Sequence, residues 1–293
     1  MKESKNPSHP IDKVIDPTFQ KRLREVVSLY PMPALSFAQG TVDEKGATLA
    51  AFIGNLATVR NYNFPGTCID VGANIGAFSF VAAHHFNRVI AFEPVLRSCE
   101  TFGEHIKRHG LVNISVYNLA VGKADNETVE IYVPNDEEYS GDASNHWEVD
   151  RGGKGGYVEE RQTISLETIL EIVGPTAEHG FLYLKVDCEG AEYDFLLDKD
   201  LSFIDALAIE FHGDFDNQKK LARHLDKSFI ILQACPDLST FFAVRKVVNK
   251  VYPNTRSLCL WKPGDTIMHP YEPLPNTGFL SAIEAKEAKL NVT

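Results

Sequence analysis

Two acidic residues stand where the chain could hold a nucleoside-type ligand. Asp70 lies at the end of the apolar run 67–71, just before a turn in which Gly72 and Gly76 are separated by three residues, and Glu93 ends the next apolar run, 88–92. A strand–glycine–helix junction presents backbone N–H groups to a ligand, and an acid at the end of the following strand accepts bonds from both ribose hydroxyls. The pair predicts a nucleoside site.

The sequence of the turn also distinguishes between two classes of cofactor, dinucleotides and S-adenosylmethionine. A dinucleotide site needs the pattern G-x-G-x-x-G, whereas this turn has only Gly72 and Gly76, and the Asp70 carboxylate would repel a pyrophosphate. S-adenosylmethionine carries an ammonium group and no phosphate, so we expect it as the cofactor. Asn118 and Ala120 follow the third apolar run, where the adenine would lie. The expected cofactor-binding residues are Asp70, Gly72, Asn74, Gly76, Glu93, Asn118 and Ala120.

A second group of polar residues could carry catalysis. Asp187 and Glu189 directly follow the apolar run 181–186, Lys185 lies two positions before Asp187, and His212 follows the run 205–211. Because an alcohol is too weak an acid to accept a methyl group unaided, a base or a metal ion must lie within about 3 Å of its hydroxyl. In one mechanism His212 or Asp187 takes the proton, and Lys185 holds the carboxylate or the nascent oxyanion.

In the alternative mechanism, Asp187 and Glu189, with Glu210 or His212, bind a divalent ion such as Mg²⁺ that polarises the acceptor. We prefer the protein base and assign no residue as a metal ligand. The catalytic residues are then Asp187, His212, Lys185 and Glu189. Two structural explanations compete with this assignment. Lys185 and Asp187 could form a simple ion pair, and Glu189 and Glu192 could be favoured only by a helix N-terminus.

The elements that must position these residues alternate along the chain. Expected strands lie at 67–71, 88–92, 113–117, 181–186, 205–211, 229–232 and 257–261, and expected helices at 19–29, 48–61, 97–110, 165–173 and 219–225. Segment 241–251 fits a strand or a short helix. Such alternation predicts an α/β fold with a mostly parallel central sheet and helices on both faces.

Three motifs occur in order: DVGANIG at 70–76, AFEP at 91–94 and LKVDCEGAE at 184–192. Together they resemble the FkbM family of S-adenosylmethionine-dependent methyltransferases, over roughly residues 65–215. The resemblance implies a class I methyltransferase (Rossmann-like) fold and transfer to a hydroxyl oxygen. It does not name the acceptor.

The expected organisation is an arm with a short helix at 1–47, a methyltransferase domain at 48–262 and a tail at 263–293. Within the domain, two strand-like runs at 127–164 interrupt the alternation and enclose the polar, glycine-rich segment 134–156. Long polar segments of this kind inside a domain are commonly functional loops. We expect a β-hairpin insertion between the third and fourth strands, with its tip covering the acceptor.

Net charge, cysteine spacing and hydropathy restrict the substrates and the cellular location that we expect. The net charge of −11 argues against a nucleic-acid substrate, because polyanion binders usually carry a basic face. None of the five cysteines has C-x-x-C spacing, the first ten residues lack the apolar core of a signal peptide, and no membrane-length apolar run occurs. We expect a cytoplasmic enzyme that O-methylates a small molecule or glycan. The competing functions are an NAD-dependent oxidoreductase and a catalytically silent cofactor-binding scaffold.

Overall fold

The computed structural model describes residues 66–84, 86–134, 156–174, 180–234, 240–246 and 278–291. The helices expected at 19–29 and 48–61 and the strand expected at 257–261 lie outside these residues, as do the arm at 1–47 and most of segment 134–156. The tail is described only at its last helix. No helix within the described ranges is long and apolar enough to cross a bilayer.

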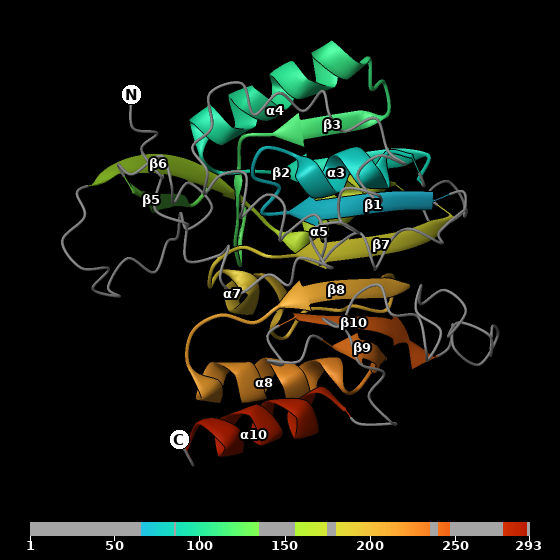
Figure 1. Ribbon diagram of the computed structural model, residues 1–293, viewed down its shortest axis with the longest axis vertical. Helices are drawn as coiled ribbons and strands as arrows, with labels where there is room; N and C mark the ends of the chain where they lie inside the picture. Colours follow the sequence, from blue (N-terminus) through green and yellow to red (C-terminus); the bar gives the residue numbers. More distant parts are fainter. Residues whose placement is uncertain are drawn as a thin grey trace, which may run out of the picture.

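A seven-stranded sheet forms the centre of the protein, in the order β3-β2-β1-β7-β8-β10-β9 (Figure 1). Strands β1, β2, β3, β7 and β8 pair in parallel, whereas β10 runs antiparallel to both β8 and β9. The strands are β1 (Gly66–Val71), β2 (Arg88–Phe92), β3 (Ile114–Tyr117), β7 (Phe181–Val186), β8 (Ala206–Glu210), β9 (Phe229–Ala234) and β10 (Thr240–Arg245).

The central strands are buried on both faces, which explains their nearly continuous apolar sequences. All six residues of β1 are buried, as are the last five of β7. Two charged residues break this pattern: Asp70 of β1 pairs in register with Lys185 of β7. The sheet therefore carries two opposite charges side by side in its core.

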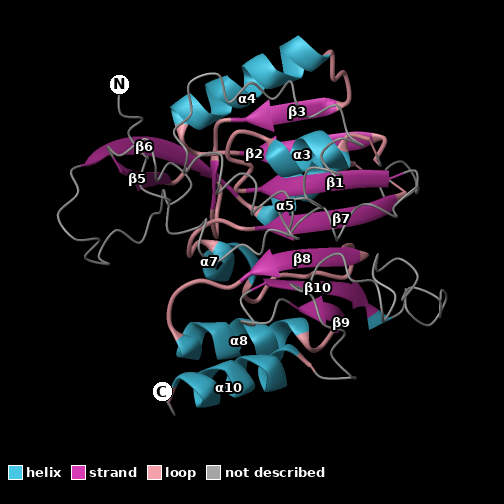
Figure 2. Cartoon of the chain, viewed as in Figure 1, coloured by secondary structure: helices cyan, strands magenta, loops and turns pink. Residues whose placement is uncertain are grey.

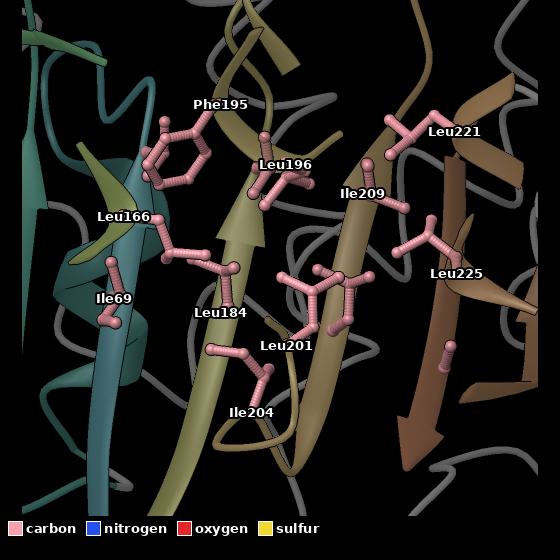
Figure 3. Close-up of a cluster of buried hydrophobic side chains, with 14 of the residues drawn as sticks. Ile69, Leu166, Leu184, Phe195, Leu196, Leu201, Ile204, Ile209, Leu221 and Leu225 are labelled. Carbon is pink, nitrogen blue, oxygen red and sulfur yellow. The ribbon is translucent and has the colours of Figure 1, made fainter. Parts of the chain in front are cut away.

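Helices cover both faces of the sheet (Figure 2). On one face, α3 (Ala77–Ala82) and α4 (Leu96–His109) pack through Phe78, Phe80 and Phe102. The other face carries α5 (Leu166–Val173), α7 (Glu192–Leu196), α8 (Phe215–Leu225) and α10 (Phe279–Leu290). Figure 3 shows side chains of α5, α7 and α8 meeting those of β1, β7 and β8 in this larger core.

Local signals set the helix ends. The side chain of Ser165 caps α5 by accepting a hydrogen bond from the Thr168 N–H, and Asp214 caps α8 through the Asn217 N–H. Helix α4 ends at Gly110 in the left-handed conformation. Asp226, directly after α8, accepts bonds from the first two N–H groups of α10 and so fixes the C-terminal helix against α8.

The predicted insertion is present. Strands β5 (Thr128–Pro134) and β6 (Gly156–Ile164) form an antiparallel hairpin, and β6 also pairs in parallel with the two-residue strand β4 (Ala120–Val121). The hairpin packs on the main domain through Ile131 and Val133, which contact Val95 and Ala120. It therefore lies beside the carboxyl ends of the parallel strands.

Candidate active site

The residues predicted to bind and react gather at one edge of the sheet. In Figure 1 the arrowheads of the parallel strands point to the left, toward the hairpin and α7. Asp187 and Glu189 follow β7 at this edge, Glu210 and His212 lie at the end of β8, and Glu93 follows β2. Parallel strands place their carboxyl ends together, which is where open α/β sheets bind ligands.

The turn between β1 and α3 is built from left-handed residues: Gly72, Asn74 and Gly76 have φ values of 73°, 49° and 89°. A Cβ atom at Gly72 would lie 1.7 Å from the carbonyl oxygen of Asp187, and one at Gly76 would enter the ring of Phe102. The glycines are therefore required because the turn packs closely against β7 and α4. The turn bonds to β2 as well, where the N–H groups of Gly72 and Ala73 donate to Phe92 O.

Glu93 fastens this turn to the start of α4. Its carboxylate accepts hydrogen bonds from the N–H of Asn74 at 2.7 Å and of Val95 at 2.8 Å. Burial raises the pKa of Glu93 to about 7, although both bonds act to lower it. The Asn118 amide donates to the carbonyls of Glu93 and Pro94, so it positions Glu93.

Asp70 and Lys185 form an ion pair inside the sheet. Lys185 Nζ lies 3.2 Å from Asp70 Oδ1 and 3.5 Å from Asp187 Oδ2, and it donates to Gly72 O at 2.8 Å. The Ser79 hydroxyl donates to Asp70 at 2.6 Å. Burial alone would lower the pKa of Lys185, but the charges of Asp70 and Asp187 outweigh it and raise that pKa above its ordinary value. The lysine is therefore a cation that links the glycine turn to Asp187.

Carboxylates surround the imidazole of His212. Its Nε2 lies 3.9 Å from Asp187 Oδ1, 3.7 Å from Glu189 Oε2 and 3.8 Å from Glu210 Oε1. Three atoms that could bind a metal ion, one each from Asp187, Glu210 and His212, lie within 4.8 Å of one another. All four side chains are partly exposed, between 20% and 36%. We call Asp187, Glu189, Glu210 and His212 the acidic cluster.

Glu192 contacts the acidic cluster from the protein interior. Its fully buried carboxylate accepts the backbone N–H groups of Gly190 and His212, and its Oε1 lies 3.3 Å from His212 Nδ1. The Tyr193 hydroxyl donates to the carbonyl of His212. Burial would lower the pKa of His212, but the contact with Glu192 and the charges of Glu189, Glu192 and Asp187 raise it to about 9. The field at this position is strongly negative.

A cleft opens next to the acidic cluster. Its walls come from the ends of β1, β2, β4 and β7 and from the hairpin, and most of its lining is apolar. The lining residues are Val71, Gly72, Phe92, Pro94, Leu119, Ala120, Val121, Ile131, Cys188 and Ala191. Its cavity volume is about 30 Å³.

The site residues predicted from the sequence fall into three places in the structure: the cleft, the buried ion pair and the acidic cluster. Gly72 and Ala120 line the cleft. The side chains of Asp70 and Lys185 are buried against each other, whereas Asp187, Glu189 and His212 meet at the acidic cluster. The sequence left Glu192 open between catalysis and a helix end, and we did not include it among the expected site residues, although its place in the motif at 184–192 was a signal that it belongs to the site.

The fold and this site define the class of protein: a mostly parallel sheet with a glycine turn after β1 and acids after β2 and β7 is the arrangement of class I methyltransferases. The family model described as "Methyltransferase FkbM domain" matches residues 70–243. The chain belongs to the FkbM methyltransferase family, as the three sequence motifs predicted. No match was found among curated proteins.

Solved structures show distant similarities. FkbM methyltransferase from Methylobacillus flagellatus is 17% identical, covering 78% of this chain and 58% of that one, with a TM-score of 0.41. SMU.1697c, a putative methyltransferase from Streptococcus mutans in complex with SAH, is 11% identical, covering 65% of this chain and 93% of that one, with a TM-score of 0.40. YcgJ from Bacillus subtilis is 11% identical, covering 26% and 35%, with a TM-score of 0.22. The chain thus spans about a third of the length of YcgJ and just over half of the length of the Methylobacillus protein.

Proposed function

We propose that this methyltransferase uses S-adenosylmethionine to methylate a hydroxyl oxygen of a small molecule or glycan. The observation that carries the proposal is the position of the acidic cluster next to the apolar cleft. Gly72 and Cys188 line the cleft, and the backbone of Asp187 packs against Gly72. A cofactor in the cleft and an acceptor at the cluster would therefore be neighbours.

The residues around the cleft fit the cofactor's parts. The apolar lining suits an adenine base. Glu93 offers a carboxylate at the end of β2, the place at which such folds hold ribose hydroxyls. The side-chain oxygen of Asn74 is buried and has no hydrogen-bond partner among the described residues, so it can accept a bond from the cofactor's ammonium group. Asp70 acts indirectly, because Lys185 connects it to the glycine turn.

When bound, S-adenosylmethionine supplies a methyl group on a positively charged sulfur, and its transfer to oxygen leaves a neutral thioether. The protein must align the hydroxyl and accept its proton. The acidic cluster provides the proton acceptors, and Lys185 holds Asp187 in place from inside the sheet. The four carboxylates of Asp187, Glu189, Glu192 and Glu210 around one imidazole favour a neutral or cationic acceptor over an anionic one.

Calorimetry and a methyl-transfer assay test the proposal. Wild-type protein should bind S-adenosylmethionine and its demethylated product, and it should label at least one compound of a library of alcohols and sugars. Glu93→Gln should weaken cofactor binding at least tenfold. Asp187→Asn should lower turnover at least a hundredfold and change cofactor affinity less than threefold. Binding of NAD in place of S-adenosylmethionine, or cofactor binding without transfer to any hydroxyl, would contradict it.

A further inference from the structure

We infer that the acidic cluster is a binding site for a divalent cation of the Mg²⁺ or Mn²⁺ type, held by Asp187, Glu210 and His212. The inference rests on the proposed function, since the cation would bind the acceptor hydroxyl there. It starts from geometry. Donor atoms of these three residues, from the ends of β7 and β8, converge to within 4.8 Å of one another.

The distances suit closure around an ion. A cation bound about 2.1 Å from each ligand atom places neighbouring ligands about 3 Å apart. His212 Nε2 is now 3.9 Å from Asp187 Oδ1 and 3.8 Å from Glu210 Oε1. Because both acids are partly exposed, small side-chain rotations would bring them to ligand distance without moving the sheet. Two carboxylate oxygens and one imidazole nitrogen leave positions for water and for the acceptor oxygen.

One ring nitrogen of His212 lies 3.3 Å from a buried carboxylate, although outside hydrogen-bonding geometry. A histidine that binds a metal through one ring nitrogen usually directs the other to a carboxylate. Here Nδ1 faces Glu192, whose side chain is fully buried, and the same Glu192 oxygen accepts the backbone N–H of His212. The opposite nitrogen, Nε2, therefore points to the carboxylates of Asp187 and Glu210.

The excess of carboxylates at the site also favours binding of a cation. Five carboxylates, those of Asp70, Asp187, Glu189, Glu192 and Glu210, lie within 4 Å of a basic nitrogen of either Lys185 or His212. Lys185 already lies between Asp70 and Asp187, and its side chain is only 5% exposed. A divalent ion would offset the excess negative charge where a hydroxyl must develop oxyanion character.

The inference divides the acidic cluster into two roles. Asp187, Glu210 and His212 hold the cation, which lowers the pKa of a hydroxyl bound to it. Glu189 faces the same imidazole nitrogen at 3.7 Å but does not belong to the converging trio. Its carboxylate stays unligated beside the cation and would take the hydroxyl proton.

Electron paramagnetic resonance of Mn²⁺ tests the site without cofactor or turnover. The full chain, stripped with EDTA and dialysed, is titrated with Mn²⁺, and the loss of the free-ion signal gives the affinity. We expect wild-type protein to bind Mn²⁺, and Asp187→Asn and Glu210→Gln to bind it at least tenfold more weakly. Glu287→Gln is the matched control, because Glu287 on α10 is 32% exposed, close to the 36% of Glu210.

Each outcome decides the question. Weaker binding in both variants, with the control unchanged, supports the site. An undiminished free-ion signal with wild-type protein, or wild-type affinity in either variant, overturns it. Thermal midpoints show whether each variant is folded, and Glu210→Gln does not disturb the Lys185 pair. Calorimetry with S-adenosylmethionine in EDTA separates this inference from the proposed function, because cofactor binding there can succeed while Mn²⁺ binding fails.

Discussion

The ammonium group of Lys185 lies 3.2 Å from the carboxylate of Asp70, with side chains 5% and 0% exposed. Both residues point to the face of the sheet that α3 covers, where the Phe78 ring centroid lies 5.9 Å from Lys185 Nζ. The same ammonium bonds to Gly72 O and approaches Asp187. One buried cation thus ties the cofactor turn to the acidic cluster.

Removing this cation should be costly. Lys185→Met leaves Asp70 buried without its ionic partner, and breaking one half of a buried pair typically costs about 3–5 kcal/mol. Urea unfolding measures the loss. Lys219→Met is the control, because Lys219 forms its pairs with Asp216 and Glu287 on the helical surface, where ion pairs contribute little. If both variants unfold at the same urea concentration, the internal pair does not stabilise the fold.

The glycine turn gives a second prediction. Gly72→Ala should destabilise the protein by about 2–4 kcal/mol, because φ is positive and the new Cβ would lie 1.7 Å from Asp187 O. Gly103→Ala in α4 should instead stabilise it by about 0.5–1 kcal/mol, since a Cβ there meets no atom within 4 Å. Thermal unfolding of both variants checks the opposite signs, and a neutral Gly72→Ala would show that the turn is not tightly packed.

Glu93 predicts a pH dependence of stability. Burial raises its pKa from 4.5 to about 7 in the folded state, so between these values the unfolded chain has lost the proton that the folded chain keeps. Below pH 4.5 Glu93 is protonated in both states, and its effect on the free energy of unfolding is most favourable. That free energy then falls as pH rises through 7, by up to about 3 kcal/mol. Denaturant midpoints across pH 4–8 measure the fall.

The control for this pH effect is Glu93→Gln, which has no proton to lose. The stability difference between wild type and Glu93→Gln should change across pH 4.5–7, whereas the difference between wild type and Glu100→Gln should stay constant, because Glu100 is exposed on α4. Parallel curves for wild type and Glu93→Gln would show that the carboxyl group ionises alike in both states.

Much of the sheet could be predicted because its strands are buried on both faces. The apolar run 181–186 is bounded by Gly180 and Asp187, and it coincides with β7. Segment 241–251 could not be assigned, since Lys and Arg interrupt its apolar residues. Its first part became β10 through antiparallel pairing with β8 and β9, a long-range interaction that local sequence does not encode.

The site was predictable in its residues and less so in their contacts. The acid near the end of β1 and the acids after β2 and β7 follow from motif positions, but side-chain partners depend on strand register. Asp70 meets Lys185 because the two are aligned across β1 and β7, 115 positions apart in sequence. Glu192 illustrates the same limit: its acidic type suits a helix start, whereas its contacts with Gly190 and His212 exist only in the fold.

Glu192 yields the last prediction. As a residue that orients His212 without being a proposed ligand, it should control metal affinity indirectly. Glu192→Gln keeps the size of the side chain but removes the charge facing His212 Nδ1, and loss of such support typically weakens metal binding 10–100-fold. Mn²⁺ titration measures the change. Asp194→Asn is the control, because Asp194 is exposed on the same helix. Equal Mn²⁺ affinities in folded Glu192→Gln and Asp194→Asn would mean that Glu192 does not orient the histidine for a metal.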